Sequence, residues 1–85
     1  MKTTEPNPNA AQLQRAADFY VQGGLEEAIA LLTAEDPDVQ YARACLLLEA
    51  GRPAECADVL TRLLQTFPDS PLKNVSQDVL FRLSP

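Results

Sequence analysis

The chain has 85 residues, with 7 Lys plus Arg against 12 Asp plus Glu and a formal net charge of −5. Its length bounds it to one small domain, and its acidic charge lacks the positive patch that binds phosphate backbones, so we expect no nucleic-acid partner. Histidine is absent, which removes the commonest general base near neutral pH and the commonest metal ligand, while 46% apolar residues are too many for a disordered chain.

Residues 1–8 are almost free of apolar side chains and contain two prolines, and we interpret them as a flexible N-terminal arm. No apolar run of the signal-peptide type follows the early lysine, and no stretch approaches the roughly 20 apolar residues that span a bilayer. Two cysteines are too few for a disulfide scaffold, and we expect both as free thiols. These features predict a cytoplasmic protein without a membrane span.

Apolar residues recur at helical spacing along the rest of the chain, and no segment sustains the alternation of a strand. We therefore predict an all-α protein of about five antiparallel helices. Asn9 is expected to cap the first helix, over residues 10–22, and Gly23-Gly24 to end it, because glycine tolerates the left-handed conformation that follows a helix. A second helix is expected over 25–34.

Cap-then-proline signals mark the later helices, because Asp and Ser cap helix N-termini and proline is favoured at the first helical position. Asp36-Pro37 predicts a third helix that runs to about Ala50 and stops at Gly51. Pro53 predicts a fourth helix that ends at Gln65 or Thr66, and Ser70-Pro71 a last helix over 71–83.

The two halves of the chain align with a shift of 28 residues. Small residues recur under this shift, since Ala16 aligns with Ala44 and Ala28 with Cys56. Two antiparallel helices joined by a tight turn need small side chains where they approach most closely. The other aligned pairs are Phe19 with Leu47, Gly23 with Gly51, Glu27 with Glu55, Leu31 with Val59 and Leu32 with Leu60.

This pattern resembles the tetratricopeptide repeat (TPR) family, whose helix–turn–helix unit of about 34 residues has small, large apolar, Gly, Ala and late Pro positions. The stretch YARACLLLEAGRPAECADVLTRLLQTFP, residues 41–68, matches through Ala44, Leu47, Gly51, Cys56 and Pro68. The domain would then be residues 9–85, with units at about 9–36 and 37–70 and a final helix that carries Asp78 where a small residue is usual. The alternative is an antiparallel helical bundle without repeats.

The resemblance implies that the first helices of successive units line a concave groove that binds a protein partner. Carried over position by position, the groove residues are Leu13, Ala17, Tyr20, Val21, Tyr41, Cys45, Leu48, Val75 and Val79, with Glu49 at the edge. These are apolar or small, so the basic clamp that some family members use for an acidic C-terminus is absent. Two tyrosines in an apolar groove suit an amphipathic helix.

No sequence pattern indicates catalysis or cofactor binding. We find no catalytic residue, no phosphate loop and no spacing for a metal or another cofactor. The carboxylate pairs Glu26-Glu27 and Asp36-Asp38 are interpreted as solvated helix ends. Cys45 has no histidine to activate it, so a buried thiol within a helix is expected rather than a nucleophile.

The predicted function is therefore a non-enzymatic binding module, a small adaptor or chaperone that holds an apolar or amphipathic helix. Small TPR-like chaperones of bacterial type III secretion are similar, although no motif here is specific to them. The alternative is a structural subunit that self-associates through the same groove as a homo-oligomer.

Overall fold

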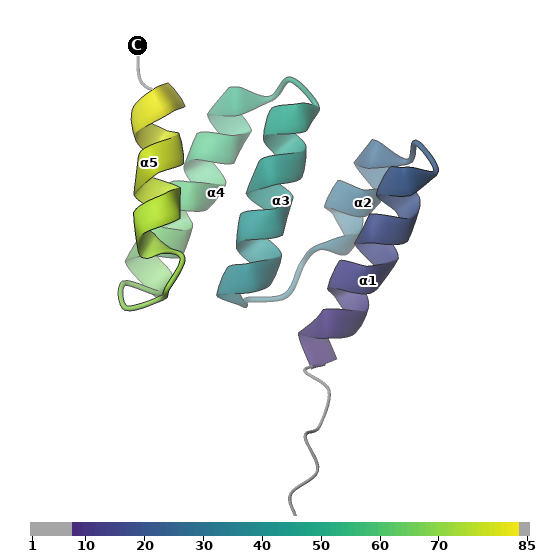
Figure 1. The fold of residues 1–85 in the computed structure, drawn as a ribbon, viewed down its shortest axis with the longest axis horizontal. Coiled ribbons are helices and arrows are strands. Elements are labelled where there is room, and N and C mark those ends of the chain that lie inside the picture. Colours follow the sequence, from purple (N-terminus) through teal and green to yellow (C-terminus); the bar gives the residue numbers. More distant parts are fainter. Residues whose placement is uncertain (1–7, 84–85) are drawn as a thin grey trace, which may run out of the picture.

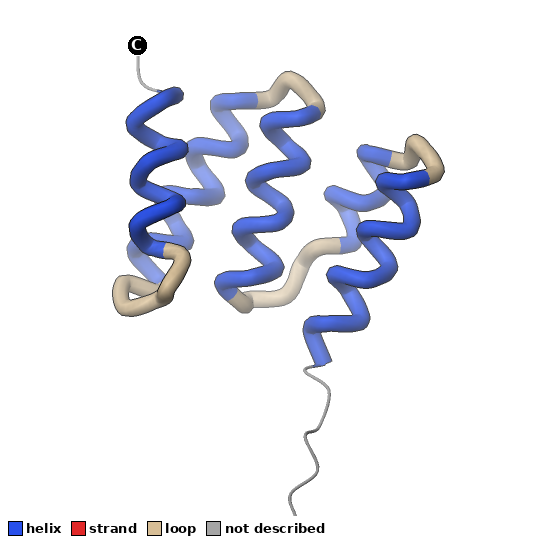
Figure 2. Tube along the Cα trace, viewed as in Figure 1, coloured by secondary structure: helices blue, strands red, loops and turns tan. Residues whose placement is uncertain are grey.

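The computed structural model describes residues 8–83, and within this range the chain forms five α-helices and no strand (Figures 1 and 2). The helices are α1 (Pro8–Val21), α2 (Leu25–Leu31), α3 (Pro37–Glu49), α4 (Pro53–Thr66) and α5 (Lys73–Leu83). The predicted all-α class is confirmed. The predicted arm, residues 1–8, lies outside the described residues except for Pro8, which is the first residue of α1.

The helices form two layers. In Figure 1, α1, α3 and α5 lie in front, and α2 and α4 lie behind them. Consecutive helices pack as antiparallel pairs, α1 with α2, α3 with α4 and α4 with α5, and α3 also packs on α1 and α2. The first and third helices therefore lie side by side and share one face of the molecule.

The same turn joins both helix pairs. In the first, the backbone N–H of Gly23 donates to the carbonyl of Tyr20 (3.0 Å) and that of Gly24 to the carbonyl of Phe19 (2.7 Å). In the second, Gly51 donates to Leu48 (3.0 Å) and Arg52 to Leu47 (2.9 Å), so the pattern recurs after 28 residues. Gly23 and Gly51 have φ of 87° and 77°, the left-handed region expected of the residue after a helix.

Burial follows the same 28-residue shift. The four aligned small residues are buried, Ala16 at 4%, Ala28 at 0%, Ala44 at 1% and Cys56 at 1% exposure, and so are Leu32 and Leu60. These residues belong to two core clusters. One contains Ala16, Ala28, Leu32 and Val39. The other contains Ile29, Ala44, Leu47, Cys56 and Leu60.

The aligned pair Phe19 and Leu47 differs in burial, at 39% and 1% exposure. Leu47 shares a core cluster with Ile29 of the preceding helix pair, whereas no helix pair within the described residues precedes Phe19. The outermost helix of a stacked array has one neighbour fewer than the inner ones, which leaves its equivalent position open.

Three of the predicted helix ends are wrong. α1 begins at Pro8, so Asn9 lies inside the helix and is not its cap. α2 ends at Leu31 rather than Ala34, because the next backbone groups bond elsewhere: the N–H groups of Thr33 and Ala34 both donate to Gln12 Oε1 at 3.2 Å. The Gln40 side chain also donates to the carbonyl of Ala34, at 2.7 Å.

The last helix begins at Lys73, two residues after the predicted start, and the Ser70 hydroxyl accepts a hydrogen bond from the Leu72 N–H at 3.0 Å. Its buried small residue is Ser76, at 0% exposure, whereas Asp78 is exposed. The small, buried position that the sequence alignment assigned to Asp78 is therefore occupied by Ser76. The predicted start of α3 is confirmed, since the Asp36 carboxylate accepts from the Val39 N–H at 3.3 Å.

Candidate functional site: an apolar groove

Two apolar hollows lie on the face shared by α1, α3 and α5. The larger, which we call the α1–α3 hollow, has a volume of about 260 Å³ and is lined by Leu13, Ala16, Ala17, Tyr20, Leu32, Ala42, Cys45 and Leu46. The smaller, the α3–α5 hollow, has a volume of about 90 Å³ and is lined by Tyr41, Ala44, Cys45, Leu48, Cys56, Leu60 and Val79. Cys45 lines both, so the two hollows meet there, and we call them together the apolar groove.

Seven of the nine residues predicted for the groove line one of these hollows. Leu13, Ala17 and Tyr20 lie in the α1–α3 hollow, Tyr41, Leu48 and Val79 in the α3–α5 hollow, and Cys45 in both. Val21 and Val75 line neither, and their side chains are 82% and 43% exposed.

Sequence reasoning missed Ala42 and Leu46, which line the α1–α3 hollow from the side of α3 that faces α1. They are four residues apart and therefore share one helix face. The sequence carries this spacing, but only the packing of α3 against α1 makes that face part of the groove. The buried Ala16 and Leu32 also contribute to the lining.

The two cysteines differ in exposure. Cys56 is buried, as predicted, but Cys45 is exposed, so the expectation of a buried Cys45 thiol is wrong. Both are free thiols, as predicted, and both line the α3–α5 hollow. Partial loss of hydration inside the hollow raises the pKa of each thiol above its ordinary value, even though Cys45 as a whole residue is exposed, and the Tyr41 hydroxyl partly offsets the rise at Cys45. A raised pKa lowers the thiolate fraction near neutral pH, so neither thiol is an activated nucleophile.

Tyr41 and Tyr20 differ in burial and in the groups near their hydroxyls. Tyr41 is half-buried against the core cluster, and burial, followed by the nearby Cys45, raises the pKa of its hydroxyl. The negative charge of Asp78 on α5 contributes to the same rise of the Tyr41 pKa. Tyr20 is 44% exposed, and its hydroxyl donates to Glu49 Oε2 at 3.4 Å. That bond links α1 to the last residue of α3 across the groove.

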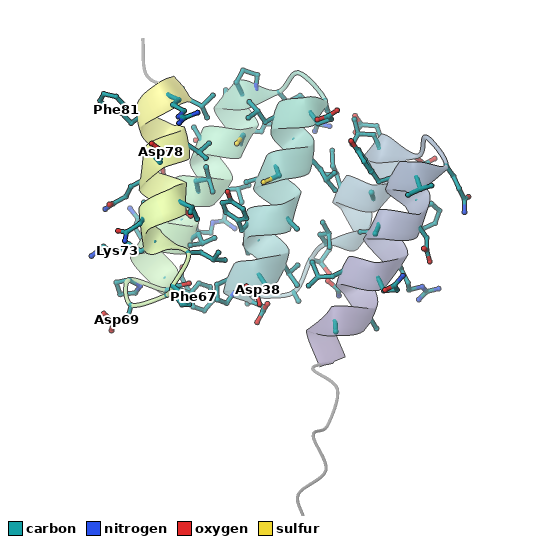
Figure 3. All side chains as sticks on the ribbon, viewed as in Figure 1. Asp38, Phe67, Asp69, Lys73, Asp78 and Phe81 are labelled. Atoms are coloured by element: carbon teal, nitrogen blue, oxygen red, sulfur yellow. The ribbon has the colours of Figure 1, made fainter. Side chains whose placement is uncertain are left out.

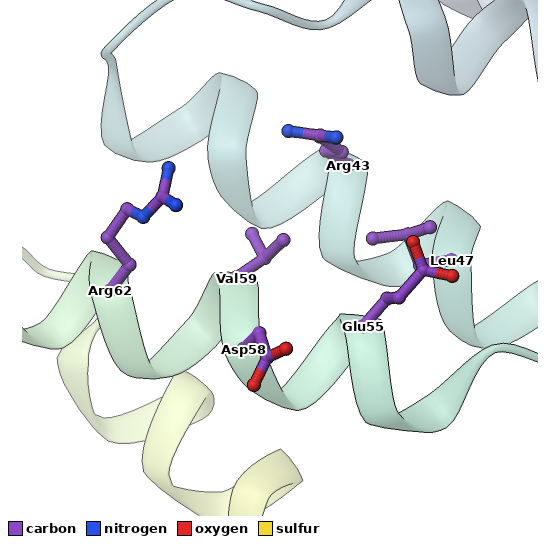
Figure 4. Close-up of a pocket in the computed structure, with 6 residues that line it drawn as sticks. All are labelled: Arg43, Leu47, Glu55, Asp58, Val59 and Arg62. Atoms are coloured by element: carbon purple, nitrogen blue, oxygen red, sulfur yellow. The ribbon is translucent and has the colours of Figure 1, made fainter.

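A third cleft, of about 170 Å³, lies between α3 and α4 and is lined by Arg43, Leu47, Glu55, Asp58, Val59 and Arg62 (Figure 4). We call it the arginine cleft. Arg43 lies two residues from Cys45, which places the two side chains on opposite sides of α3. Its Nε is buried without a hydrogen-bond partner among the described residues. Because the cleft carries two cations and two carboxylates, it has no net charge to attract an ion.

The outer face of α5 carries a large apolar side chain that the sequence analysis did not single out. Phe81 is 80% exposed and projects away from α3, as does Lys73 (Figure 3). No described helix follows α5 to cover this face. Within residues 8–83 no group of His, Cys, Asp and Glu side chains could hold a metal ion, and none of the helices is long and apolar enough to cross a bilayer.

Comparison with known proteins gives no relative. No protein-family model, no curated protein and no solved structure matches this chain. The resemblance to tetratricopeptide repeats therefore rests on the sequence pattern, and the candidate site rests on the geometry of the groove.

Proposed function

We propose that this chain is a non-enzymatic protein-binding module of the TPR-like kind, a small adaptor or chaperone that holds the apolar face of a partner helix in its groove. The observation that carries the proposal is the apolar groove itself, which passes from α1 across α3 to α5. Grooves of this kind accept the apolar face of an amphipathic helix, whose anchor residues recur at i, i+3, i+4 and i+7.

The groove has the features of a binding surface rather than of incomplete packing. Its deepest residues are held in the two core clusters, whereas Tyr20, Leu48 and Cys45 remain exposed above them. Exposed aromatic and aliphatic side chains around a preformed apolar hollow are typical anchors for a partner, since their contact area is large and little conformational freedom is lost on binding.

Cys45 offers a direct test because it is exposed and lies where the two hollows meet. In a Cys56→Ala background, a photoactivatable cross-linker attached to Cys45 will capture the occupant of the groove in extract from the source cells. The control carries the same group on the arginine cleft, through Asp58→Cys in a chain that lacks both native cysteines.

Capture from Cys45 but not from residue 58 supports the groove as the binding site. Equal capture from both positions, or none from either, contradicts it. Capture of a second copy of the chain would instead support self-association, and a mass that rises with concentration in light scattering would confirm that result.

A further inference from the structure

The stripe of α3 that faces the groove carries a carboxylate at each end. Asp38 lies three and four residues before Tyr41 and Ala42, which both line the groove, and so shares their side of the helix. Glu49 lies four residues after Cys45 on the same side, and it accepts the hydrogen bond from Tyr20. Both carboxylates are exposed. Eleven residues of helix separate them, about 16 Å along the axis of α3.

Helix stability accounts for only one of these two acids. Asp38 lies in the first turn of α3, where a negative charge interacts favourably with the helix dipole. Glu49 is the last residue of α3, where the dipole disfavours a negative charge, and the last turn contains no basic residue to offset it. The carboxylate of Glu49 therefore lies at the groove although its interaction with the dipole of α3 is unfavourable.

Within residues 8–83 no nearby cation neutralises the carboxylates of Asp38 and Glu49, so the groove has an excess of negative charge. Asp78 of α5 is paired with Arg82, at 3.2 Å on the same helix. Arg15 lies outside the groove, around a separate hollow with Asp18, Phe19 and Gln22. Arg43 and Arg62 line the arginine cleft, on the other side of α3. Asp38 and Glu49 have no ion pair among the described residues.

We infer that the partner is a basic amphipathic helix, in which Lys or Arg residues about three turns apart bracket an apolar stripe. The partner helix lies along α3, so its apolar stripe packs over Cys45, where the two hollows meet, and its two cations reach Asp38 and Glu49 at the ends of α3. This inference rests on the proposed function and adds the charge of the partner. A second copy of the chain, with its net charge of −5, would bring like charges to this face and is disfavoured as the occupant.

The test uses two synthetic helical peptides with the same apolar stripe. One has lysine at two positions eleven residues apart, and the other has glutamate at both. A third peptide, with the stripe scrambled and the lysines kept, measures attraction by charge alone. Binding is followed by fluorescence anisotropy at low and at physiological salt. We expect the lysine peptide to bind roughly tenfold more tightly than the glutamate peptide at low salt, with a smaller ratio at higher salt.

Variants identify the residues responsible. Asp38→Asn with Glu49→Gln should remove most of the preference for the lysine peptide. Asp58→Asn with Asp69→Asn makes the same change in net charge at exposed acids outside the groove, and it should leave the preference intact. Circular dichroism of both double variants checks that the helices persist.

The outcomes separate this inference from the proposed function. Equal binding of the lysine and glutamate peptides overturns the basic partner while the groove remains a binding site. If the Asp58→Asn, Asp69→Asn control also removes the preference for the lysine peptide, the inference of a basic partner is overturned too, because the net charge of the chain would then be the cause. Binding of the scrambled peptide as tight as that of the lysine peptide, or no binding of any peptide, contradicts the proposed function itself.

Discussion

Gly23 and Gly51 each adopt a positive φ at the turn of a helix pair, and a Cβ added at either would meet no atom within 4 Å. The cost of replacing them is therefore conformational rather than steric. Left-handed backbone places the Cβ of an L-residue close to the following carbonyl oxygen, and asparagine tolerates this better than alanine does.

We predict that Gly51→Ala lowers the free energy of unfolding by about 1–2 kcal/mol and that Gly51→Asn lowers it by less. Urea denaturation followed by circular dichroism measures both. If the alanine variant is as stable as the parent, the turn between α3 and α4 does not need the left-handed conformation.

Three side chains at the α3–α5 hollow, Tyr41, Cys45 and Cys56, have pKa values raised above their ordinary values. A group whose pKa is higher in the folded state contributes stability below its unfolded pKa and loses it as pH rises through the folded pKa. The unfolded values are about 8.5 for cysteine and about 10 for tyrosine. Stability should therefore fall as pH rises from about 8.5 and continue to fall above pH 10.

Urea denaturation at a series of pH values measures this loss. A Tyr41→Phe, Cys45→Ser variant, which retains only the Cys56 thiol of the three groups, should show a shallower alkaline decline. A parent protein whose stability is constant up to pH 10.5 would contradict the prediction.

Within the helices, truncating a side chain to alanine has a different effect on stability at the groove face than in the core. Leu60 of α4 is 1% exposed, Tyr41 of α3 is half-buried against the same core cluster, and Tyr20 of α1 is 44% exposed. Truncation in the core loses apolar burial and leaves a cavity, whereas truncation at the surface loses little of either.

We predict that Leu60→Ala lowers the free energy of unfolding by about 2–5 kcal/mol. Tyr41→Ala should lower it by less and Tyr20→Ala by least, and both should retain most of the helicity. If both tyrosines are anchors, each alanine variant should also weaken binding of the helical peptide by about 2 kcal/mol. A Tyr41→Ala variant that unfolds as readily as Leu60→Ala would place Tyr41 in the core and remove it from the groove.

At the scale of the whole molecule, two core clusters lie side by side and are joined by few residues. Leu46 packs against both, and Ile29 of α2 belongs to the cluster that α3 and α4 form. An ion pair also crosses between the helix pairs, Arg52 Nη1 to Glu26 Oε1 at 2.6 Å, but both side chains are exposed, so it adds little stability. Helix pairs joined by so few contacts are able to open separately.

We predict that amide hydrogen exchange is slowest in α3 and α4 and faster in α1 and α2, because α2 has only seven residues and α1 lies at the end of the array. Leu46→Ala should speed exchange in α1 and α2 more than in α4, since it weakens the contact between the clusters. Exchange of all protected amides with one common free energy would show instead that the described helices unfold as one unit.

Local sequence was sufficient to predict the helical class, the start of α3 at Asp36-Pro37 and the glycine turns, because caps, prolines and left-handed glycines act through atoms only a few residues away. It also indicated that Ala16, Ala28, Ala44 and Cys56 are buried, since their spacing repeats with the helix pairs.

Only the tertiary structure decided the features that depend on a distant neighbour. α2 stops at Leu31 because side chains of α1 and α3 bond to the residues that follow, and Phe19 is exposed because no helix pair among the described residues packs against it. Cys45 is exposed and Ala42 lines the groove because of where α1 and α5 lie beside α3. Helical periodicity indicates which residues share a face, but exposure of that face depends on the segments packed against it.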